Sequence, residues 1–250
     1  MRNMEACRVL PHESGDGAEN MALDEALLDS VAADPSAAVV RTYSWPAPTL
    51  SLGYFQPIAL AESDPRWRGV PIVRRPTGGG ALWHDREVTY AVIIPAGHPL
   101  ARRSADLYRA VHGALAGLLT EAGVEARRRG AAGAAPDAKP FLCFADRDAE
   151  DVVAGPAKLV GSAQRRRAGA VLQHGSILLA GSSRTPELPG LAEVANVAIE
   201  PAAWARRIAE SIPPTLGLAS FRGEISSEER ATASRLAAEV YRNPAWTRKR

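Results

Sequence analysis

The sequence predicts an α+β fold, in which helices pack on a mixed, mainly antiparallel sheet. Runs rich in β-branched and aromatic residues lie within 38–94 and 151–179, and helical patterns stand between and after these runs. The elements do not follow the regular βαβ alternation of a parallel sheet. Three strand patterns after residue 150 follow one another directly, which is typical of an antiparallel meander.

The composition is that of a folded globular protein, with 46% hydrophobic and 23% charged residues in a chain of 250. This length suffices for one large domain with a proper core. We expect a single domain over residues 1–250, with its core at about 6–185. Residues 186–250 are expected to form a C-terminal helical part of the same domain.

The ends and the cysteines indicate a cytoplasmic protein in a reducing environment. The first residues contain no apolar signal core, and no stretch approaches the roughly 18 apolar residues of a membrane span. Cys7 and Cys143 form neither a disulfide framework nor a metal-type pair. With a net charge of +2, we expect no binding to nucleic acid, and the arginine triplets at 127–129 and 165–167 read as solvated faces. We also expect a monomer that does not bind membranes.

The first half of the chain contains one helix and four strands. Residues 20–33 carry the apolar stripe of an amphipathic helix. Residues 38–45 and 49–55 predict two strands around a turn that contains Pro46 and Pro48. Further strands are expected at 71–75 and at 87–94, where Pro95 stops the second of them.

The second half begins with the clearest helix. Ser104 is its expected N-cap and Gly123 its C-terminal stop, and its apolar face is formed by Leu107, Val111, Leu115, Leu118 and Leu119. Residues 130–140 predict a mobile loop that leads to residues 141–144. Strands follow at 151–154, 158–166 and 170–179. The box Ser226 to Glu229 then starts a helix with Ala233, Leu236 and Val240 turned inward.

Residues 74–85, Arg-Arg-Pro-Thr-Gly-Gly-Gly-Ala-Leu-Trp-His-Asp, carry the densest functional signal. Three consecutive glycines expose bare backbone N–H groups to which a ligand can bind. Arg74 and Arg75 are expected at the mouth of this loop, where they could hold a phosphate or carboxylate bidentately. The pattern is neither a Walker loop nor a dinucleotide fingerprint. A tight hairpin would explain two glycines but not the paired arginines and the histidine that flank three.

Cys143 and Lys158 are the candidates for reactive groups. Cys143 follows a flexible stretch and is either a small buried hydrophobe or a nucleophile that takes an acyl group from a thioester. Lys158 is one of three lysines, with Lys139 and Lys249, among 30 basic residues. Unlike arginine, a lysine is a compact charge whose proton can be lost on burial. Lys158 or a histidine could lower the pKa of the Cys143 thiol.

The five histidines do not have metal-ligand spacing, so we expect no metal site. His112 lies on the amphipathic helix and is interpreted as structural. His84 and His174 lie within the motif segments, where each could orient a neighbour or act as a base.

Four segments together resemble the lipoate-protein ligase and octanoyltransferase family, which is similar in fold to biotin protein ligases. They are Asn-Met-Ala-Leu-Asp-Glu at 20–25, Ser-Leu-Gly-Tyr-Phe-Gln at 51–56, the glycine loop at 74–85, and Lys-Leu-Val-Gly-Ser-Ala-Gln-Arg at 158–165 through Leu-Gln-His-Gly-Ser-Ile-Leu at 172–178. They occur in the family's order and cover roughly residues 20–180.

The resemblance implies a biotin/lipoate protein ligase-like catalytic domain, with a tunnel for a medium-length acyl chain. It implies that Lys158 contacts the acyl carbonyl and that residues 80–83 line the acyl site. Catalysis is assigned to Cys143 and Lys158. The expected substrate-binding residues are Arg74, Arg75, Thr77, Gly78, Gly79, Gly80, Ala81, Leu82, Trp83, His84, Gly161, Ser162, Ala163 and His174.

Two chemistries occur in the family, and both remain open at this point. Octanoyltransferases take the octanoyl group from acyl carrier protein onto a cysteine, and no cofactor is implied. Ligases activate a free acid as an adenylate, which implies ATP and Mg²⁺. Cys143 placed before Lys158 resembles the transferases, whereas Gly80 resembles the ligase loop. A non-catalytic acyl or biotin-type sensor is a third possibility.

The transferase hypothesis has two steps. Cys143 attacks the octanoyl thioester, while Lys158 and backbone N–H groups near residues 161–163 stabilise the oxyanion. A lysine of a lipoyl domain, in a glycine-cleavage H protein or a 2-oxoacid dehydrogenase E2, then attacks the Cys143 thioester. Lys158 or a neighbouring group would help remove the proton of that lysine, and arginine clusters would speed the docking of acidic partners.

Overall fold

The computed structural model describes residues 6–131, 140–167 and 169–250. Its strands are β1 (Ala6–Val9), β2 (Glu13–Ser14), β3 (Ala37–Ser44), β4 (Thr49–Leu52), β5 (Ile72–Arg74), β6 (Leu82–His84), β7 (Glu87–Pro95), β8 (Ala126–Arg128), β9 (Val152–Ala154), β10 (Ala157–Arg167), β11 (Ala170–Leu178) and β12 (Ala219–Arg222). Its α-helices are α1 (Gly17–Ala33), α2 (Ala59–Glu62), α3 (Ser104–Glu121), α4 (Leu191–Val194), α5 (Pro201–Thr215), α6 (Ser227–Leu236) and α7 (Pro244–Thr247).

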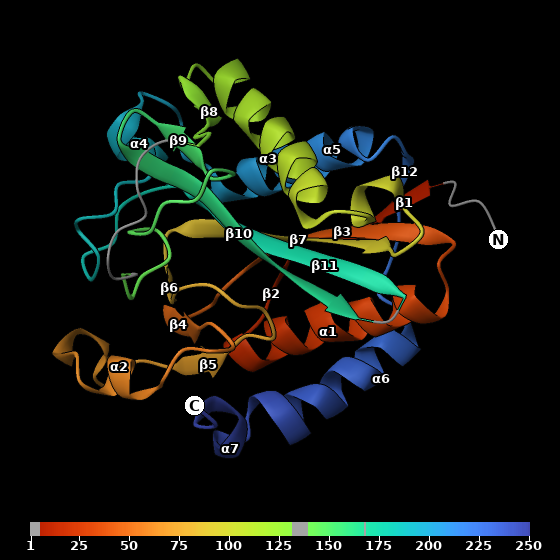
Figure 1. Ribbon diagram of the computed structural model, residues 1–250, viewed down its shortest axis with the longest axis horizontal. Coiled ribbons are helices and arrows are strands. Elements are labelled where there is room, and N and C mark those ends of the chain that lie inside the picture. The colour runs from red at the N-terminus through yellow and green to blue at the C-terminus, as the bar shows by residue number, and fades with distance from the viewer. Residues whose placement is uncertain (1–5, 132–139, 168) are drawn as a thin grey trace.

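A large twisted sheet crosses the middle of the molecule (Figure 1). Within the described ranges it has nine strands, in the order β12-β1-β3-β7-β11-β10-β9-β8, with β2 paired to β3. Every pair from β3 to β8 is antiparallel, whereas β1 runs parallel to β12 and β3, and β2 parallel to β3. A smaller sheet has the order β5-β4-β6. This confirms the predicted mixed, mainly antiparallel α+β class.

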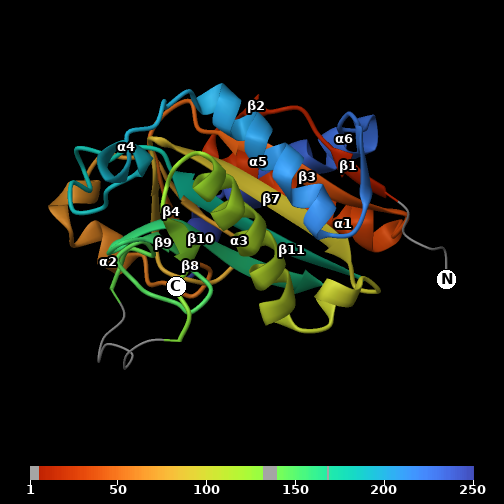
Figure 2. The ribbon, with the colours of Figure 1, turned by 90° about the horizontal axis from the view of Figure 1, so that it is seen from above.

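Helices cover both faces of the large sheet. Figures 1 and 2 show α3 and α5 on one face and α1 and α6 on the other. Successive side chains of a strand point to opposite faces, and in β7 Tyr90 and Val92 join the cluster beneath α3 and α5, while Ala91 and Ile93 join the cluster beneath α1. Because both faces of β7 are buried, this strand is a nearly continuous apolar run.

The first helix is longer and more buried than its sequence pattern predicted. It begins at Gly17 rather than at residue 20, because Asp16 accepts a hydrogen bond from the Glu19 N–H and Glu19 reaches back to the Asp16 N–H. Its outer side is covered by α6, so most of its residues are buried, and the exposed polar side chains lie near its ends, at Glu19 and Asp29. The prediction of an amphipathic helix was therefore incomplete.

The meander of three strands is confirmed. β9 and β10 are joined by a turn at Gly155 and Pro156, where Gly155 has a φ of 55°, and β10 pairs with β11 from Val160 to Arg167. The predicted strand at 49–55 stops at Leu52, and it lies in the small sheet, apart from its neighbour β3. Of the predicted loop at 130–140, residues 132–139 lie outside the described ranges.

The C-terminal third contains a helix that the sequence analysis missed. Trp204, Ile208 and Ile212 of α5 are buried against the sheet, and their spacing of four is a helical signal. Pro213 and Pro214 in its last turn obscure that pattern. The capping box of α6 is confirmed, with Ser226 and Glu229 bonded reciprocally, and α6 continues into a π-helical turn, Ala237–Tyr241, that contains Val240.

The long helix α3 keeps the predicted buried face but begins differently. Its N-cap is Arg103, without a side-chain hydrogen bond, and Ser104 is the first helical residue. The predicted stop is present at Gly123, whose φ of 86° favours glycine. Neither α3 nor any other helix in the described ranges combines the length and apolar content needed to cross a bilayer.

Candidate active site

Cys143 is attached through its backbone to the segment that precedes β6. Its N–H donates to the Ala81 carbonyl at 2.8 Å, and the Ala81 N–H donates to the Phe141 carbonyl at 2.8 Å. Ala81 and Leu142 thus form a parallel β-bridge. The chain segment that carries the thiol is therefore fixed against the end of the glycine loop.

Gly80 permits this close approach. A Cβ at this position would lie 2.9 Å from the Cys143 nitrogen and 3.1 Å from both the Cys143 Cα and the Phe141 carbonyl oxygen. These are backbone atoms, so any side chain at position 80 would push the Cys143 segment away. The third glycine of the loop resembles the ligase sequence, but here it is needed because the Cys143 segment packs against it.

Lys158 reaches Cys143 from β10. The strand register shifts between Lys158 and Val160, and such a bulge re-aims a side chain. The Lys158 Nζ donates to the Cys143 carbonyl at 2.9 Å and lies 3.8 Å from Sγ. Gly161 leaves room for it, since a Cβ there would lie 2.8 Å from the Lys158 Cε. A cation beside a thiol favours the thiolate, which is the nucleophilic form.

Asp151 completes this group, although the sequence analysis did not select it. Its Oδ2 lies 2.9 Å from the Lys158 Nζ, and both side chains are buried. Burial raises the pKa of Asp151, while the charge of Lys158 opposes that rise. The carboxylate also accepts the Asp148 N–H at 2.6 Å. This ion pair stabilises the ammonium form of Lys158.

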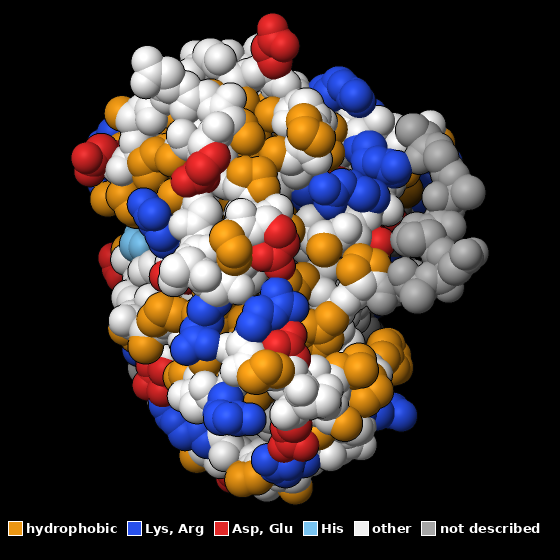
Figure 3. All heavy atoms as spheres, turned by 90° about the vertical axis from the view of Figure 1, so that its left-hand side faces the viewer, with side chains coloured by type: hydrophobic (Ala, Val, Ile, Leu, Met, Phe, Trp, Pro, Cys, Tyr) orange, Lys and Arg blue, Asp and Glu red, His pale blue; other side chains and the backbone are white. Residues whose placement is uncertain are grey.

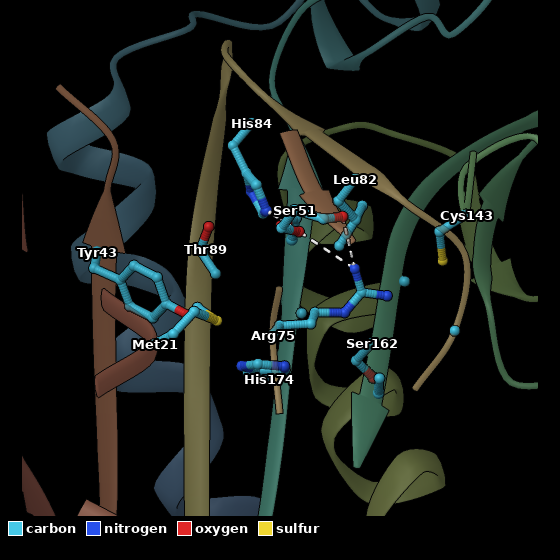
Figure 4. Close-up of a pocket in the computed structure, with 15 residues that line it drawn as sticks. Met21, Tyr43, Ser51, Arg75, Leu82, His84, Thr89, Cys143, Ser162 and His174 are labelled. Atoms are coloured by element: carbon cyan, nitrogen blue, oxygen red, sulfur yellow. Dashed lines mark hydrogen bonds between the residues drawn. The ribbon is translucent and has the colours of Figure 1, made fainter. Parts of the chain in front are cut away.

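A narrow pocket opens beside the thiol (Figure 4). Cys143 and Ser162 stand on one side of it, Met21 and Tyr43 stand on the opposite side, and Arg75 lies between. The pocket holds only about 30 Å³ of open space, which is room for about two waters. The predicted site residues that line this pocket are Arg75, Gly79, Leu82, His84, Cys143, Gly161, Ser162, Ala163 and His174.

His84 is held by two partners in the pocket wall. Its Nδ1 donates to Glu87 Oε1 at 2.6 Å, its Nε2 lies 2.8 Å from Ser51 Oγ, and its ring stacks on Trp45. Burial works to raise the pKa of Glu87, but the charge of His84 and hydrogen bonds from His84, Ser176 and Thr89 outweigh it, so the pKa is lowered. The Glu87 carboxylate therefore fixes the imidazole at Nδ1, and its Nε2 is directed at the Ser51 hydroxyl.

His174 makes an equivalent pair on β11. Its Nδ1 lies 2.8 Å from Asp24 Oδ2, and its Nε2 lies 2.7 Å from Thr77 Oγ1. Asp24 also accepts the Tyr43 hydroxyl at 2.8 Å and pairs with Arg41 at 3.3 Å. The Asp24 carboxylate, which lies in the first family-like segment, thereby connects helix α1 to the glycine loop through His174.

His112 of helix α3 makes a third such pair. Its Nε2 lies 2.7 Å from Ser162 Oγ, and its Nδ1 lies 2.5 Å from the Glu150 carbonyl. Burial lowers the pKa of His112 to about 4, so the ring is neutral at pH 7. In the described ranges, no group of three or more His, Cys, Asp or Glu side chains is arranged to hold a metal ion.

These pairings explain how a wall rich in polar residues can enclose an apolar space. Ser51, Thr77 and Ser162 each bond to a histidine, and each histidine is anchored at its second nitrogen. Buried polar groups that bond to one another leave little polar surface facing the pocket. The pocket is therefore suited to an alkyl chain.

Arg74 and Arg75 were predicted to lie at the mouth of the glycine loop and bind an anion, and this prediction was wrong. Arg74 is fully buried and donates to the carbonyls of Gly53, Gln56 and Thr247 at 2.7–3.0 Å. Arg75 is 2% exposed and donates to the carbonyls of Ser51, Gly78 and Gly80. Both arginines therefore fix the loop itself. Burial lowers the pKa of Arg75 to about 10.

Successive side chains along β6 point to opposite sides, so only some of the remaining predicted residues face the pocket. Leu82 faces the pocket, whereas Ala81 and Trp83 face a different apolar cluster with Leu142 and Trp67. The Trp83 Nε1 donates to Ser182 Oγ at 2.9 Å. Ala81 and Trp83 do not line the pocket as expected, because successive strand residues point in opposite directions. Thr77, Gly78 and Gly80 contribute to the loop that frames it.

Several residues of the site were missed by the sequence analysis. Met21, Asp24 and Ser51 lie in segments that resembled the family, so their positions there were a usable signal. Tyr43 lines the pocket from a strand whose sequence pattern is that of an ordinary core strand. Nothing in that local pattern distinguishes a pocket wall from an interior.

Comparison with known proteins gives consistent matches. Residues 16–203 match the lipoyl protein ligase A/B catalytic domain family. The chain is 34% identical to octanoyltransferase LipM of Kyrpidia tusciae over 268 residues, which cover 94% of this chain and 96% of that protein. It is 40% identical to octanoyltransferase LipM of Moorella thermoacetica over 179 residues, covering 70% of this chain and 66% of that protein.

The fold also matches solved structures. One is a bi-partite lipoate protein ligase described with its E2 lipoyl domain, from Thermoplasma acidophilum. The TM-score is 0.72 at 19% identity, and the match covers 98% of this chain and 97% of that one. At this identity the likeness concerns the fold alone.

Proposed function

Because this chain belongs to the lipoyl protein ligase A/B catalytic domain family, we propose that it is an octanoyltransferase. It moves an octanoyl group from octanoyl-acyl carrier protein, through a thioester on Cys143, to a lysine of a lipoyl domain. The observation that carries the proposal is the Lys158 ammonium beside the Cys143 thiol at the side of an apolar pocket. The LipM relatives named above support the same reaction.

In the first step the Cys143 thiolate attacks the carbonyl carbon of the octanoyl thioester. A bond forms between Sγ and that carbon, and the carrier thiolate leaves and takes a proton from solvent. Exchange between two thioesters is nearly isoenergetic, so the octanoyl group stays activated. Lys158 stabilises both the attacking thiolate and the oxyanion of the tetrahedral intermediate.

Backbone groups of β10 support the same oxyanion. β9 pairs with β10 only as far as Val160, so from Gly161 onward β10 has β11 as a neighbour on one side. Gly161, Ser162 and Ala163 line the pocket beside Cys143. Peptide N–H groups that point away from β11 in this stretch are suited to donate to the developing charge.

The octanoyl chain occupies the pocket that runs from Cys143 toward Met21 and Tyr43. Its apolar lining favours a hydrocarbon over water. Because the open space is small, the chain enters with movement of flexible side chains such as Met21 and Leu82.

In the second step the neutral amine of the acceptor lysine attacks the Cys143 thioester. The amide forms, the thiolate returns to its place beside Lys158, and the proton released by the amine passes to solvent. Lys158 forms an ion pair with Asp151 and in this mechanism acts as a charge rather than as the base. The sequence analysis left the acceptor's proton to Lys158 or a neighbouring group, and we propose that solvent takes it instead.

The acceptor is a lipoyl domain of the glycine-cleavage H protein or E2 type. Arginine clusters were expected to dock such partners, but Arg167 pairs with Glu25 and Asp29, and Arg128 pairs with Glu150. On the face shown in Figure 3, Lys and Arg side chains are interspersed with Asp and Glu. Docking on this face would therefore depend on local charge patterns rather than on a single basic patch.

An ATP-dependent ligase is the alternative within the family. It would need no thiol nucleophile, and it would need groups for phosphate. Arg74 and Arg75 are both committed to backbone carbonyls, which favours the transferase.

The test is transfer from octanoyl-acyl carrier protein to a lipoyl domain without ATP, comparing Cys143→Ser with Cys7→Ala. Cys7 is fully buried in β1, and burial raises its pKa to about 12, so its loss leaves the chemistry intact. We expect Cys143→Ser to lose at least about a thousandfold in rate and Cys7→Ala to keep the rate. A Cys143→Ser protein that octanoylates the lipoyl domain from free octanoate and ATP would establish a ligase.

A further inference from the structure

We propose that Gln56 is a positioning residue for Cys143, which it holds in register with Lys158 through the backbone of Phe141. The inference rests on the proposed function for the reaction that it serves, but the contacts that carry it are independent of any substrate. Gln56 lies in the loop after β4, and its side chain spans the gap between this loop and the Cys143 segment.

The Gln56 side chain uses both ends of its amide. Its Nε2 donates to the Phe141 carbonyl at 3.0 Å, and its Oε1 accepts the Gly53 N–H at 3.0 Å. The Phe141 carbonyl also accepts the Ala81 N–H, so this oxygen is held from two sides. Cys143 is two residues further along. The segment that presents the thiol is thus fixed by the glycine loop and by Gln56 together.

The loop that carries Gln56 is itself braced. Arg74 donates to the Gln56 carbonyl at 2.7 Å and to the Gly53 carbonyl at 2.8 Å, and the same guanidinium donates to the Thr247 carbonyl of α7. A Cβ on Gly53 would lie 2.0 Å from the Gly79 carbonyl oxygen, so this loop is pressed against the glycine loop. Gln56 therefore extends from a rigid base.

The geometry requires an amide at this position. A carboxylate at position 56 would accept the Gly53 N–H but would have no hydrogen to give to the Phe141 carbonyl, and an alkyl group would do neither. The Phe141 carbonyl would then keep only its hydrogen bond from the Ala81 N–H. The Lys158 contacts with the Cys143 carbonyl and Sγ depend on the position of this segment, so its loosening would weaken the cation's effect on the thiolate.

The measurement is the alkylation rate of Cys143 by iodoacetamide as a function of pH, together with the rate of acyl-enzyme formation from octanoyl-acyl carrier protein. For Gln56→Leu we expect the pH of half-maximal alkylation to rise and acyl-enzyme formation to slow by about tenfold. Gln164→Leu is the matched control, because its amide bonds to Ser104 and Gln173 instead. This control should keep both values.

Gln56→Glu is the second variant, since it keeps the bond to Gly53 and removes only the donor to Phe141. Melting curves identify which of the two variants is folded, and either one suffices. The inference is overturned if the pH of half-maximal alkylation is unchanged in a folded Gln56 variant. If the unsubstituted protein forms no acyl-enzyme, the proposed function fails, and the alkylation profile still decides the role of Gln56.

Discussion

Cys143 acquires its proposed role from its neighbours rather than from its own sequence context. The flanking Phe141 and Phe144 are compatible with a small buried hydrophobe, and Phe144 is indeed buried. What differs is the Lys158 ammonium at 3.8 Å from Sγ, on a strand fifteen residues later in the chain. The second cysteine, Cys7, is buried in the core, and no cation among the described residues lies beside its thiol as Lys158 lies beside Cys143.

Replacement of Lys158 by methionine tests this contact. Lys158→Met removes the cation and leaves the Asp151 carboxylate, so the Cys143 thiolate becomes less stable. We predict that iodoacetamide alkylates Cys143 more slowly at pH 7 in Lys158→Met than in the parent protein. Lys249→Met is the control, since the Lys249 ammonium lies over the Tyr54 and Trp246 rings. Alkylation curves that coincide for Lys158→Met and the parent protein would contradict the assigned contact.

The two arginines of the glycine loop show that the partners of a side chain are difficult to predict from sequence. Paired arginines before glycines suggested an anion site. The same donors bond to backbone carbonyls instead, and one of these, that of Thr247 at the end of α7, is distant in sequence. Sequence spacing does not reveal which acceptors the fold brings to a guanidinium.

Among the elements, the segment from Gly80 to β6 controls both the thiol and the pocket. Gly80→Ala places a Cβ against three backbone atoms of the Cys143 segment. We predict that acyl-enzyme formation falls by at least about a hundredfold, because small displacements of a reacting group are costly. Stopped-flow acylation measures this. A Gly80→Ala protein with the parent's acylation rate would show that the close backbone approach is not needed.

Helix α3 provides the matched glycine substitution. A Cβ at Gly117 meets no heavy atom within 4 Å, and the residue lies in the helix interior. We predict that Gly117→Ala stabilises the protein by roughly 0.5–1 kcal/mol and leaves acylation unchanged. Urea unfolding gives the free energy. Destabilisation would mean that α3 is packed more tightly around Gly117 than its surroundings indicate.

The elements that were predicted correctly are those with a strong local period. The α3 stripe, the β9–β10–β11 meander and the capping box at Ser226 each depend on residues that are close in sequence. The parallel pairing of β1 with β12 joins residues more than 200 positions apart, and no local pattern encodes it. The packing of α6 over α1 is likewise a long-range contact, and it made an amphipathic-looking stripe into a buried helix.

For the site, the sequence identified the participating segments but not the directions of their side chains. Leu82 and Trp83 were expected together, and strand alternation placed them in different clusters. Asp151 begins a strand predicted at 151–154, yet its pairing with Lys158 required the turn at Gly155 that brings β9 beside β10.

At the level of the whole molecule, helices cover both faces of the large sheet. Helix α5 packs against the same face as α3, and α6 packs over α1 on the other face. Residues 201–241 thus cover strands contributed by residues 6–178. This arrangement supports the proposal that the chain forms a single domain.

The buried histidines make stability depend on pH. The folded pKa of His112 is about 4 against an ordinary value of 6.5, because burial disfavours its charged form. Between these values the unfolded chain binds more protons than the folded one. The free energy of unfolding therefore falls as the pH decreases from about 6.5 to about 4, by up to roughly 3 kcal/mol from this residue.

His112→Gln tests this dependence and keeps polar groups facing Ser162 and Glu150. We predict that the free energy of unfolding of the variant falls less steeply between pH 6.5 and 4 than that of the parent. His98, whose pKa burial also lowers, retains part of the slope. Parallel curves for parent and variant, measured by urea unfolding, would mean that His112 is not kept neutral in the folded protein.

Intact-mass measurement after mixing with octanoyl-acyl carrier protein determines whether the octanoyl group rests on Cys143 during transfer. We predict one octanoyl adduct that hydroxylamine removes, that maps to Cys143, and that disappears when a lipoyl domain is added. No adduct should form in Cys143→Ser, and Cys7→Ala should behave as the parent. An unmodified protein that nevertheless octanoylates the lipoyl domain in the Cys143→Ser form would contradict the account.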